Sequence, residues 1–454
     1  MTEKALATPA VGETSVAYRN EGSRSRGLFD RALMVMPGGN TRHSVALSPY
    51  PVYLAGGRGC RVTDVEGQER IDFLNNFTSL ILGHADPEVT AAARERIERG
   101  TAFAGPTEAD VALAELLVER VPAIERIRFC NSGSEAVMLA VKAARAFTGR
   151  AKLAKIEGAY HGIYDYAQMS EVSNPSNWGP ADHPASVPDA GTASGAGADV
   201  VVMPWNDADA CERLLEENKD QLAAVILDAL PLGLSMVTPL PGFLDRVVAA
   251  ARRHGILVIA DEILNFRIDY HGVFAASGLT PDIVCLAKII GGGFPVGAVG
   301  GRADIMEVFD HRRPNPVHHG GTYNGNPVSM VAGLVTMRRM TPEAYAKLNR
   351  LGDSLREQLG AMLRARGIAA QVFGRGSLFS VRLTADPLLN WRDVNNHSRN
   401  EPIYGRICHA MLGRGILMSQ RGIMGSLSTP MGASEIGAFV DALDSTLASL
   451  GRTA

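Results

Sequence analysis

The sequence predicts an α/β protein with a mainly parallel seven-stranded sheet. Seven short apolar runs lie between residues 126 and 300, and stretches with the pattern of helices or loops separate them. Most of these runs are apolar throughout instead of alternating between apolar and polar residues. Strands of that kind are buried on both faces, which is typical of a parallel sheet covered by helices.

The N-terminal part is predicted to contain a flexible lead (1–25), one helix and several short strands. The helix covers 23–36, and the breaker Pro37-Gly38-Gly39 ends it. Residues 51–74 alternate apolar runs with Gly-containing turns, a pattern that favours short strands. Two helices follow over 86–100 and 107–121, and Asp86-Pro87 is a typical cap and first position for the earlier of them.

The central part alternates strands with helices, and the C-terminal part forms a smaller α+β unit. The predicted strands cover 126–130, 151–156, 199–203, 223–227, 256–260, 282–287 and 296–300, with helices over 134–148, 208–218 and 242–254 and an exposed loop over 180–197. Helices over 326–340, 342–366 and 433–450 and two or three strands follow. We therefore expect a large domain of 76–330 and a small domain that combines the N-terminal segment 1–75 with 331–454.

Composition excludes several classes of protein. Lys plus Arg is 45 and Asp plus Glu is 48, so the net charge of 45 − 48 = −3 argues against a nucleic-acid partner. No apolar run reaches the roughly 18 residues of a membrane span, and the N-terminus has no apolar signal-peptide core. Five scattered cysteines are typical of reduced thiols in a cytoplasmic enzyme. We expect no metal, nucleic-acid or membrane partner.

Two residues at predicted strand ends carry the chemistry. Asp261 follows the apolar run 256–260, and Lys288 follows the run 282–287. An open α/β sheet binds its ligands at the carboxyl ends of its strands, where a carboxylate can meet a cationic group. A lysine in an apolar setting loses its charge more easily and becomes a nucleophile toward aldehydes. The alternatives are a helix cap or surface acid for Asp261 and a surface lysine for Lys288.

Small residues at two predicted helix starts are suited to an anion. Ser132-Gly133-Ser134 lies between a strand and a helix, where free N–H groups and the helix dipole favour a phosphate; capping by Ser134 is the alternative. A second Gly- and Asn-rich loop, 320–327, opens the helix that begins near Pro327. Tyr160, beside His161, is suited to stacking on a flat ligand or, equally, to a place in the core.

Taken together, these residues resemble the class III aminotransferases, fold-type-I enzymes that use pyridoxal phosphate. The nearest branch contains glutamate-1-semialdehyde aminomutases and β-amino-acid transaminases. The resemblance runs from about Arg31 to the C-terminal helix. It rests on the order and spacing of Met36-Pro37-Gly38-Gly39-Asn40, residues 131–136, Tyr160-His161-Gly162, Asp261-Glu262-Ile263, Lys288 with residues 291–301, and residues 321–327.

The resemblance implies a role for each motif. Lys288 would hold the cofactor as an internal aldimine, and Asp261 would keep the pyridinium nitrogen protonated. Gly133 and Ser134 would bind the phosphate, and Tyr160 would stack on the ring. Thr322 would reach the cofactor of a neighbouring subunit, so the resemblance implies a homodimer with active sites at its interface. The implied cofactor-binding set is Ser132, Gly133, Ser134, Tyr160, His161, Asp261, Ile263, Lys288 and Thr322.

Two arginines are candidate ligands for a substrate carboxylate. Arg42 and Arg421 match positions where related β-amino-acid transaminases carry such arginines, and a guanidinium fork suits a carboxylate. A surface role is the alternative for both. The chain departs from the family in having Asp228-Ala229 in place of Glu-Pro, followed by the apolar stretch 230–234, and a shortened segment at Asn265. The apolar stretch predicts a hydrophobic wall for the substrate and an aromatic or hydrophobic donor.

The expected function is transfer of an amino group from an amine or a β- or ω-amino acid to a keto acid by a ping-pong mechanism. An aminomutase of the glutamate-1-semialdehyde type or an amino-acid racemase on the same scaffold is the alternative, and consumption of an external keto acid separates the two. A non-catalytic cofactor-binding protein is a third possibility. Lys288 argues against it, because a scaffold has no need of a nucleophile.

Overall fold

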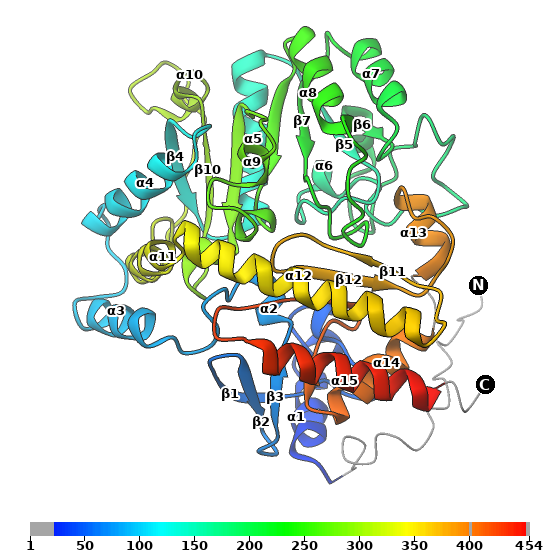
Figure 1. Cartoon of the computed structure of the whole chain (residues 1–454). Coiled ribbons are helices and arrows are strands. Elements are labelled where there is room, and N and C mark those ends of the chain that lie inside the picture. Colours follow the sequence, from blue (N-terminus) through cyan, green and yellow to red (C-terminus); the bar gives the residue numbers. More distant parts are fainter. Residues whose placement is uncertain (1–21, 399–401, 451–454) are drawn as a thin grey trace.

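The computed structural model describes residues 22–398 and 402–450 (Figure 1), so most of the predicted N-terminal lead lies outside the described residues. A seven-stranded sheet forms the upper half of the molecule in the order β4-β10-β9-β8-β7-β5-β6. Its strands are β4 (Arg126–Cys130), β5 (Lys152–Ile156), β6 (Val200–Met203), β7 (Leu222–Leu227), β8 (Leu257–Asp261), β9 (Ile283–Ala287) and β10 (Gly297–Gly301). Each lies within one or two residues of its predicted range.

The sheet is mixed, because β10 runs against both of its neighbours. It pairs antiparallel with β4 and with β9, whereas the pairs from β9 to β6 are all parallel. The link from β9 to β10 comprises only residues 288–296 and its one helical element is the short η5 (Lys288–Gly291). A parallel crossover needs a dozen or more residues and usually a helix. Because this link is shorter, β10 runs antiparallel to β9.

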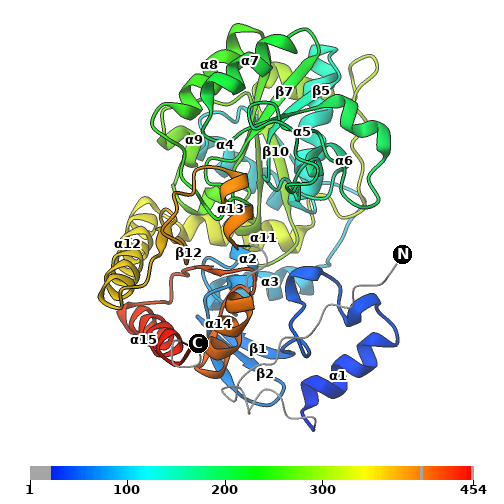
Figure 2. The same cartoon turned by 90° about the vertical axis from the view of Figure 1, so that its right-hand side faces the viewer.

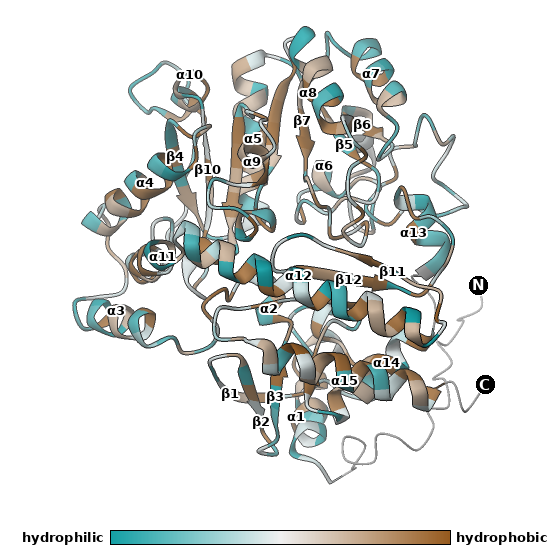
Figure 3. Ribbon diagram, viewed as in Figure 1, coloured by the Kyte–Doolittle hydropathy of each residue, from teal (hydrophilic) through white to brown (hydrophobic). Residues whose placement is uncertain are grey.

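Helices cover both faces of the large sheet. Val225 and Leu227 of β7 share an apolar cluster with α8 (Phe243–Arg253) and α7 (Ala208–Glu217). Ala224 and Ile226 belong to another cluster with α5 (Gly133–Thr148). Successive side chains of a strand point to opposite faces, so α5 and α8 lie on opposite sides. Figure 3 shows the apolar colour running along β7, as its burial on both faces requires.

Two smaller sheets lie below the large one and join distant parts of the chain (Figures 1 and 2). One contains β1 (Leu54–Arg58), β2 (Arg61–Asp64), β3 (Glu69–Asp72) and β13 (Ile416–Leu417), and the other contains β11 (Gln371–Phe373), β12 (Leu378–Arg382) and β14 (Ile423–Ser426). Strand β13 pairs parallel with β3, so the N-terminal strands share a sheet with the C-terminal region. The domain boundaries at residues 75 and 330 stay a prediction.

The other predicted helices are confirmed, with ends that shift by up to three residues. They are α1 (Arg24–Leu33), α3 (Pro87–Glu98), α4 (Glu108–Arg120), α11 (Pro327–Arg339), α12 (Pro342–Ala365) and α15 (Ala433–Leu450). Short helices α2 (Asn75–Thr78), α6 (Asp165–Gln168), α9 (Val273–Ala276) and α10 (Ala303–Met306) occur in connections. Within the described residues no helix combines the length and apolarity that crossing a membrane requires. The five cysteines are free and buried, and the cytoplasmic location inferred from them stays a prediction.

The C-terminal region holds two helices that the sequence analysis missed, α13 (Trp391–Ser398) and α14 (Pro402–Gly413). Helix α13 is anchored to the large-sheet part of the chain by Trp391, which is 1% exposed. The indole Nε1 donates to the carbonyl oxygen of Ser173 at 3.0 Å and to its Oγ at 2.9 Å. The ring also lies so close to Gly158 that a Cβ there would overlap it.

Replacing Trp391 with alanine is expected to lower the free energy of unfolding by about 3–5 kcal/mol, the usual cost of removing a large buried aromatic side chain. Trp391→Phe retains a ring but loses the N–H donor, so it is expected to cost less. Urea denaturation of both variants measures the two effects. Equal losses for alanine and phenylalanine would show that the hydrogen bonds to Ser173, and not the packing, hold α13.

Candidate active site

Three polar side chains meet where adjacent parallel strands end. Asp261 is the last residue of β8, Lys288 follows β9, and Asp228 follows β7. These strands are neighbours in the sheet and run the same way, so their carboxyl ends lie at one edge. Lys288 has φ = +53°, a left-handed conformation that non-glycine residues seldom adopt. Strain of this kind concentrates at functional sites.

A buried pair forms the floor of the site. Asp261 is 4% exposed and His161 is 1% exposed. Oδ2 of Asp261 lies 2.7 Å from Nδ1 of His161, and its Oδ1 accepts a hydrogen bond from the Ile263 amide at 3.1 Å. Burial lowers the pKa of His161, and Asp261 opposes that shift. Nε2 of His161 is buried without a partner among the described residues. Asp261 is therefore neither a surface acid nor a helix cap.

Lys288 is half-buried, so it is not a surface lysine. Burial lowers the pKa of its amine. The carboxyl groups of Asp261 and Asp228 raise that pKa, and the guanidinium of Arg267 lowers it further. An amine with a lowered pKa is more often neutral at physiological pH, which is the form that attacks carbonyl carbon.

The start of α5 offers unpaired amides beside this group. Ser132 caps the helix, since its Oγ accepts from the Glu135 amide at 3.2 Å; the capping residue is therefore not Ser134. The amides of Gly133 and Ser134 stand at the first positions of the helix, where no intrahelical acceptor exists. A Cβ at Gly133 would lie 2.8 Å from the tip of the Ile263 side chain, so a larger residue would require that side chain to move. The arrangement suits a bound anion.

Tyr160 lies at this site and not in the core, since 48% of it is exposed. Partial burial of its hydroxyl raises its pKa, while the charge of Arg421 and a hydrogen bond with Ser134 lower it. Arg421 therefore stands within electrostatic reach of the site, with its own side chain exposed. The structure brings together Ser134, Tyr160, His161, Asp261, Ile263, Lys288 and, more distantly, Arg421.

Arg42 belongs to a separate group of contacts. Its Nη2 donates to Oδ1 of Asn76 at 3.0 Å, and its guanidinium lies 4.8 Å from the centre of the Phe77 ring. No carboxylate in the described part of the chain lies within ion-pair distance of it. Asn76 and Phe77 belong to the short turn α2, in which Asn75, Asn76, Phe77 and Thr78 have φ values of 49°, 47°, 54° and 74°. Left-handed residues cost roughly 1–2 kcal/mol each.

Thr322 is exposed, on the loop that leads into α11. The loop is held next to the start of α5, because Nδ2 of Asn131 donates to Oδ1 of Asn324 at 2.8 Å. Asn326 caps α11 by accepting from the amides of Val328 and Ser329, which confirms the predicted helix start at Pro327. The role of Thr322 toward a neighbouring subunit stays a prediction.

The predicted hydrophobic wall over residues 230–234 is wrong for most of its side chains. Leu230 and Leu234 are buried in the apolar cluster of α7 and α8, and Leu232 is the exposed leucine of the stretch at 36%. Gly233 lies so close to the carbonyl of Gly158 that a Cβ would overlap it, so this approach of the loop requires glycine. These apolar residues therefore serve the core, and they carry no argument for an aromatic donor.

The sequence analysis missed the roles of three buried charged residues, Asp228, Glu262 and Arg267. Asp228 accepts from the Leu230 amide at 2.8 Å, and burial together with Asp261 raises its pKa to about 7. Asp228 directly follows an apolar run, as Asp261 does. The rule that found Asp261 could therefore also have found Asp228. No local pattern distinguishes Arg267 from a surface arginine.

Glu262 predicts a pH-dependent stability. Burial raises its pKa from an ordinary 4.5 to about 7, although the Phe274 amide donates to its Oε1 at 2.8 Å. Between pH 4.5 and pH 7 the native state keeps a proton on Glu262 that the unfolded state has lost. The free energy of unfolding therefore falls as the pH rises through this range. Glu262→Gln should be more stable than the native protein at pH 8, by about 3 kcal/mol. Melting temperatures at pH 5 and pH 8 measure this; an equal difference at both pH values would contradict it.

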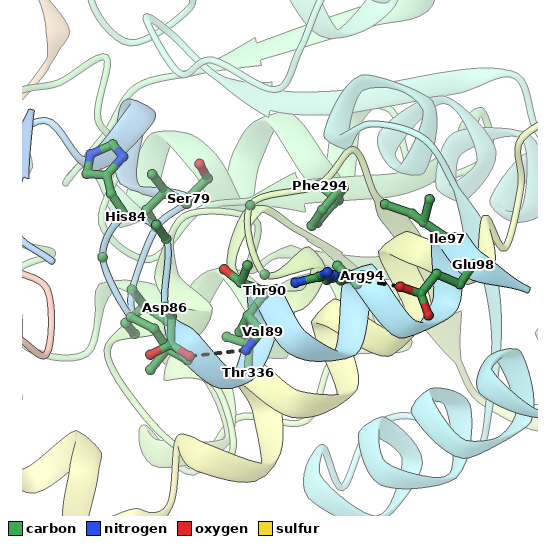
Figure 4. Close-up of a pocket in the computed structure, with 18 residues that line it drawn as sticks. Ser79, His84, Asp86, Val89, Thr90, Arg94, Ile97, Glu98, Phe294 and Thr336 are labelled. Carbon is green, nitrogen blue, oxygen red and sulfur yellow. Dashed lines mark hydrogen bonds and ion pairs between the residues drawn. The ribbon is translucent and has the colours of Figure 1, made fainter. Parts of the chain in front are cut away.

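A cavity of about 590 Å³ lies away from these residues (Figure 4). It is lined by α3 and by the segment 79–86, with Phe294 and Gly293 on another side. Neither Asp261 nor Lys288 lines it. The size of a pocket therefore does not identify the chemical site in this chain.

Known proteins match this chain over nearly its whole length. A family model described as aminotransferase class-III matches residues 44–430. A glutamate-1-semialdehyde 2,1-aminomutase 2 from Exiguobacterium sibiricum is 36% identical over 407 residues, covering 89% of this chain and 91% of the relative. An ω-transaminase structure from Sphaerobacter thermophilus is 48% identical with a TM-score of 0.91, covering 95% and 98%. A β-phenylalanine aminotransferase structure from Variovorax paradoxus is 31% identical with a TM-score of 0.85, covering 94% of each chain.

Proposed function

The chain belongs to the class III aminotransferases, and on that basis we propose that it transfers an amino group from an amino acid to a keto acid with Lys288 as its catalytic residue. The observation that carries the proposal is the half-buried amine of Lys288 within electrostatic reach of Asp261, which is itself paired with His161 at the strand ends. A nucleophilic amine and a fixed carboxylate are the two groups that a pyridoxal-phosphate enzyme needs at the reacting end of the cofactor and at its ring nitrogen.

The residues present fit pyridoxal phosphate, the cofactor of this family. The first-turn amides of Gly133 and Ser134 suit a phosphate, and Gly133 packs closely against the Ile263 side chain. Asp261, the carboxylate bound to His161, would hold the ring nitrogen. Tyr160 has an exposed ring suited to stacking. When bound, the cofactor supplies an aldehyde that condenses with amines and a ring that accepts electrons.

The chain supplies the proton transfers. In the first half-reaction Nζ of Lys288, whose pKa burial lowers, would take a proton from the carbon that bears the donor's amino group and hand it to the bound cofactor; in the second half-reaction it would move a proton the opposite way, to the acceptor's carbon. His161 fixes the orientation of Asp261 through the 2.7 Å contact. The two half-reactions use the same lysine in turn, so we expect ping-pong kinetics with release of the first product before the acceptor binds.

Arg42 and Arg421 are proposed to bind the donor's carboxylate. Both are exposed, and Arg42 has no acidic partner among the described residues. Hydrogen bonds to charged groups contribute about 1.5–3 kcal/mol, so Arg42→Ala and Arg421→Ala should each raise KM for a carboxylate donor about tenfold to a hundredfold. KM for an arylalkylamine that lacks a carboxylate should stay within about twofold, since its affinity involves no such bond. Steady-state kinetics with both donors tests this; an equal rise in KM for the two would remove the arginines from recognition.

We further propose a homodimer with active sites at its interface. Large apolar side chains are exposed on the single chain, among them Met34 at 84%, Val35 at 79% and Tyr323 at 61%. Tyr323 neighbours Thr322, the residue expected to reach the second site. Analytical ultracentrifugation measures the oligomeric state, and a monomer at micromolar concentration would refute the shared site.

An aminomutase is the second candidate. It is favoured by the relatives of 36–37% identity, which are named as glutamate-1-semialdehyde 2,1-aminomutases. The identity of 48% to an ω-transaminase structure favours transamination. An aminomutase keeps its amino group within one substrate, whereas a transaminase delivers it to an external keto acid.

The deciding experiment is a spectral half-reaction on the purified protein loaded with pyridoxal phosphate. Single donors are added without a keto acid, beginning with a β-aryl-β-amino acid, β-alanine, an α-amino acid and an arylalkylamine. A transaminase loses the cofactor's long-wavelength absorbance with its true donor and regains it when a keto acid is added. If glutamate-1-semialdehyde is converted and no other donor changes the spectrum, the aminomutase is correct. Protein that takes up no cofactor at all would refute both.

A further inference from the structure

Residues 157–163 follow β5 and form a segment, called the strap below, that carries Tyr160 and His161. The far end of the strap is fixed at the candidate site. Nδ1 of His161 lies 2.7 Å from Oδ2 of Asp261, and the last amide of the strap donates to Oγ of Ser134 at 3.2 Å. Tyr160 lies between the two ends and is 48% exposed. The direction of its ring therefore depends on what holds the near end of the strap.

Helix α13, from the C-terminal part of the chain, holds that near end (Figures 1 and 2). Nε of Arg392 donates to Oε2 of Glu157 at 3.0 Å, and the two side chains are only 14% and 3% exposed. Oγ of Ser173 donates to the other oxygen of this carboxylate at 3.0 Å. The ring of Trp391 packs against Gly158, the second residue of the strap. Side chains of α13 thus contact the first two residues of the strap.

The guanidinium of Arg392 also holds the loop around residue 179. Its Nη1 donates to the carbonyl of Gly179 at 2.9 Å, and its Nη2 donates to the carbonyls of Trp178 and Pro180, each at 2.8 Å. Its central carbon lies 4.8 Å from the centre of the Trp178 ring. All three nitrogens of one arginine therefore have acceptors, and together they join α13, the strap and this loop.

Stability alone is a weak reason for burying these two charges. Removing a carboxylate and a guanidinium from water is costly, and apolar side chains of similar volume often stabilise a protein as well or better. A guanidinium offers several donors in a rigid, planar fork, so its bonds fix the direction of the groups that it joins. The pair of Arg392 and Glu157 is therefore suited to holding the strap in one orientation.

We propose that Arg392 is a positioning residue: through its pair with Glu157 it orients the strap so that the ring of Tyr160 meets the flat face of the cofactor. The proposal rests on the proposed function, since it assumes that Tyr160 stacks on pyridoxal phosphate. Arg392 is not among the residues that meet at the candidate site, and it acts through the strap. Helix α13 thereby links the C-terminal part of the chain to the cofactor.

The test measures how tightly cofactor-free, full-length protein binds pyridoxine phosphate. This probe has a hydroxymethyl group in place of the aldehyde, so it cannot condense with Lys288, and calorimetry gives its Kd. Loss of a well-placed aromatic contact corresponds to a Kd that is about threefold to tenfold higher. We expect a rise of this size in Arg392→Met. The double variant Glu157→Leu/Arg392→Met should show the same rise, and it leaves no buried charge unpaired, so it should fold even if the single variant does not.

A double-mutant cycle separates positioning from general damage. Tyr160→Leu removes the aromatic ring and should by itself raise the Kd for pyridoxine phosphate about threefold to tenfold. If Arg392 acts through that ring, adding Arg392→Met to Tyr160→Leu should change the Kd by less than about twofold. A purely structural role of Arg392 would instead give the same rise with and without the ring.

Arg70 is the matched control, because it forms a buried ion pair in another part of the molecule. Its Nη1 lies 2.6 Å from Oδ2 of Asp64, and both side chains are 4% exposed. The pair joins β2 and β3 of the four-stranded sheet. Arg70→Met should lower the melting temperature, as Arg392→Met does, and leave the Kd for pyridoxine phosphate within about twofold of the native value.

The outcomes are distinct. A higher Kd in every folded variant of the Arg392 pair, which disappears when Tyr160 is leucine, supports the proposal. An unchanged Kd in any of these variants, an equal rise in Arg70→Met, or a rise that persists without the Tyr160 ring overturns it. An unchanged Kd in Tyr160→Leu overturns it as well, because the stacking that it assumes is then absent. Native protein that binds neither pyridoxine phosphate nor pyridoxal phosphate would refute the proposed function itself, and this inference with it.

Discussion

Lys288→Ala is expected to reduce the rate of transamination by at least about a thousandfold, because the proposed function assigns both the nucleophile and the proton carrier to this one side chain. Alanine removes the amine and leaves the cofactor without a covalent partner at the carboxyl end of β9. The backbone should change little, since the left-handed φ of +53° is no less accessible to alanine than to lysine. Initial rates and the absorbance of cofactor-loaded protein measure the two consequences separately.

Lys155 is the matched control for this substitution. It is a second buried lysine, on β5, and burial lowers its pKa to about 7. Its Nζ donates to the carbonyl oxygens of Ala159 and Met169, and no carboxylate among the described residues pairs with it. Lys155→Met should lower the melting temperature but preserve the cofactor absorbance. A small primary amine added to Lys288→Ala should restore part of the activity, and the same amine should do nothing for Lys155→Met. Loss of the absorbance in Lys155→Met and its retention in Lys288→Ala would reverse the assignment.

Asp261→Asn is expected to lower kcat about a hundredfold, because a charge-assisted hydrogen bond contributes up to about 3 kcal/mol and each 1.36 kcal/mol is a factor of ten in rate. The amide has nearly the shape of the carboxylate, so His161 keeps a partner at the same position. What is lost is the negative charge that, under the proposed function, would face the ring nitrogen of the cofactor. Single-turnover measurements with a good donor isolate this loss from changes in product release.

Asp228→Asn is the control that shares the same cluster. Burial and the neighbouring Asp261 raise the pKa of Asp228 to about 7, so this carboxyl is already close to half protonated at neutral pH. Removing its charge should therefore change kcat by less than about fivefold at pH 7. If both variants lose activity equally, the total negative charge of the cluster matters and the position of Asp261 does not.

The sequence by itself was sufficient to predict the strands, most of the helices and the residues at the strand ends. These features are local: an apolar run, a cap such as Asp86-Pro87 or a glycine cluster is visible within a few residues. The rule that parallel strands gather their ends at one edge then places Asp261 and Lys288 together without any coordinates. The motif order also identified the family, which the comparisons confirm.

Only the tertiary structure decided which residues surround that lysine and which serve the core. The apolar stretch 230–234 has the composition of a pocket wall, yet Leu230 and Leu234 are buried beneath α7 and α8. Arg267 resembles any surface arginine in sequence, yet it is fully buried against oxygens from positions 78, 377 and 427. The direction of β10, the anchoring of Trp391 and the field around Lys288 likewise depend on contacts between residues far apart in the chain. Burial and charge proximity are properties of the folded arrangement, so no local pattern could have supplied them.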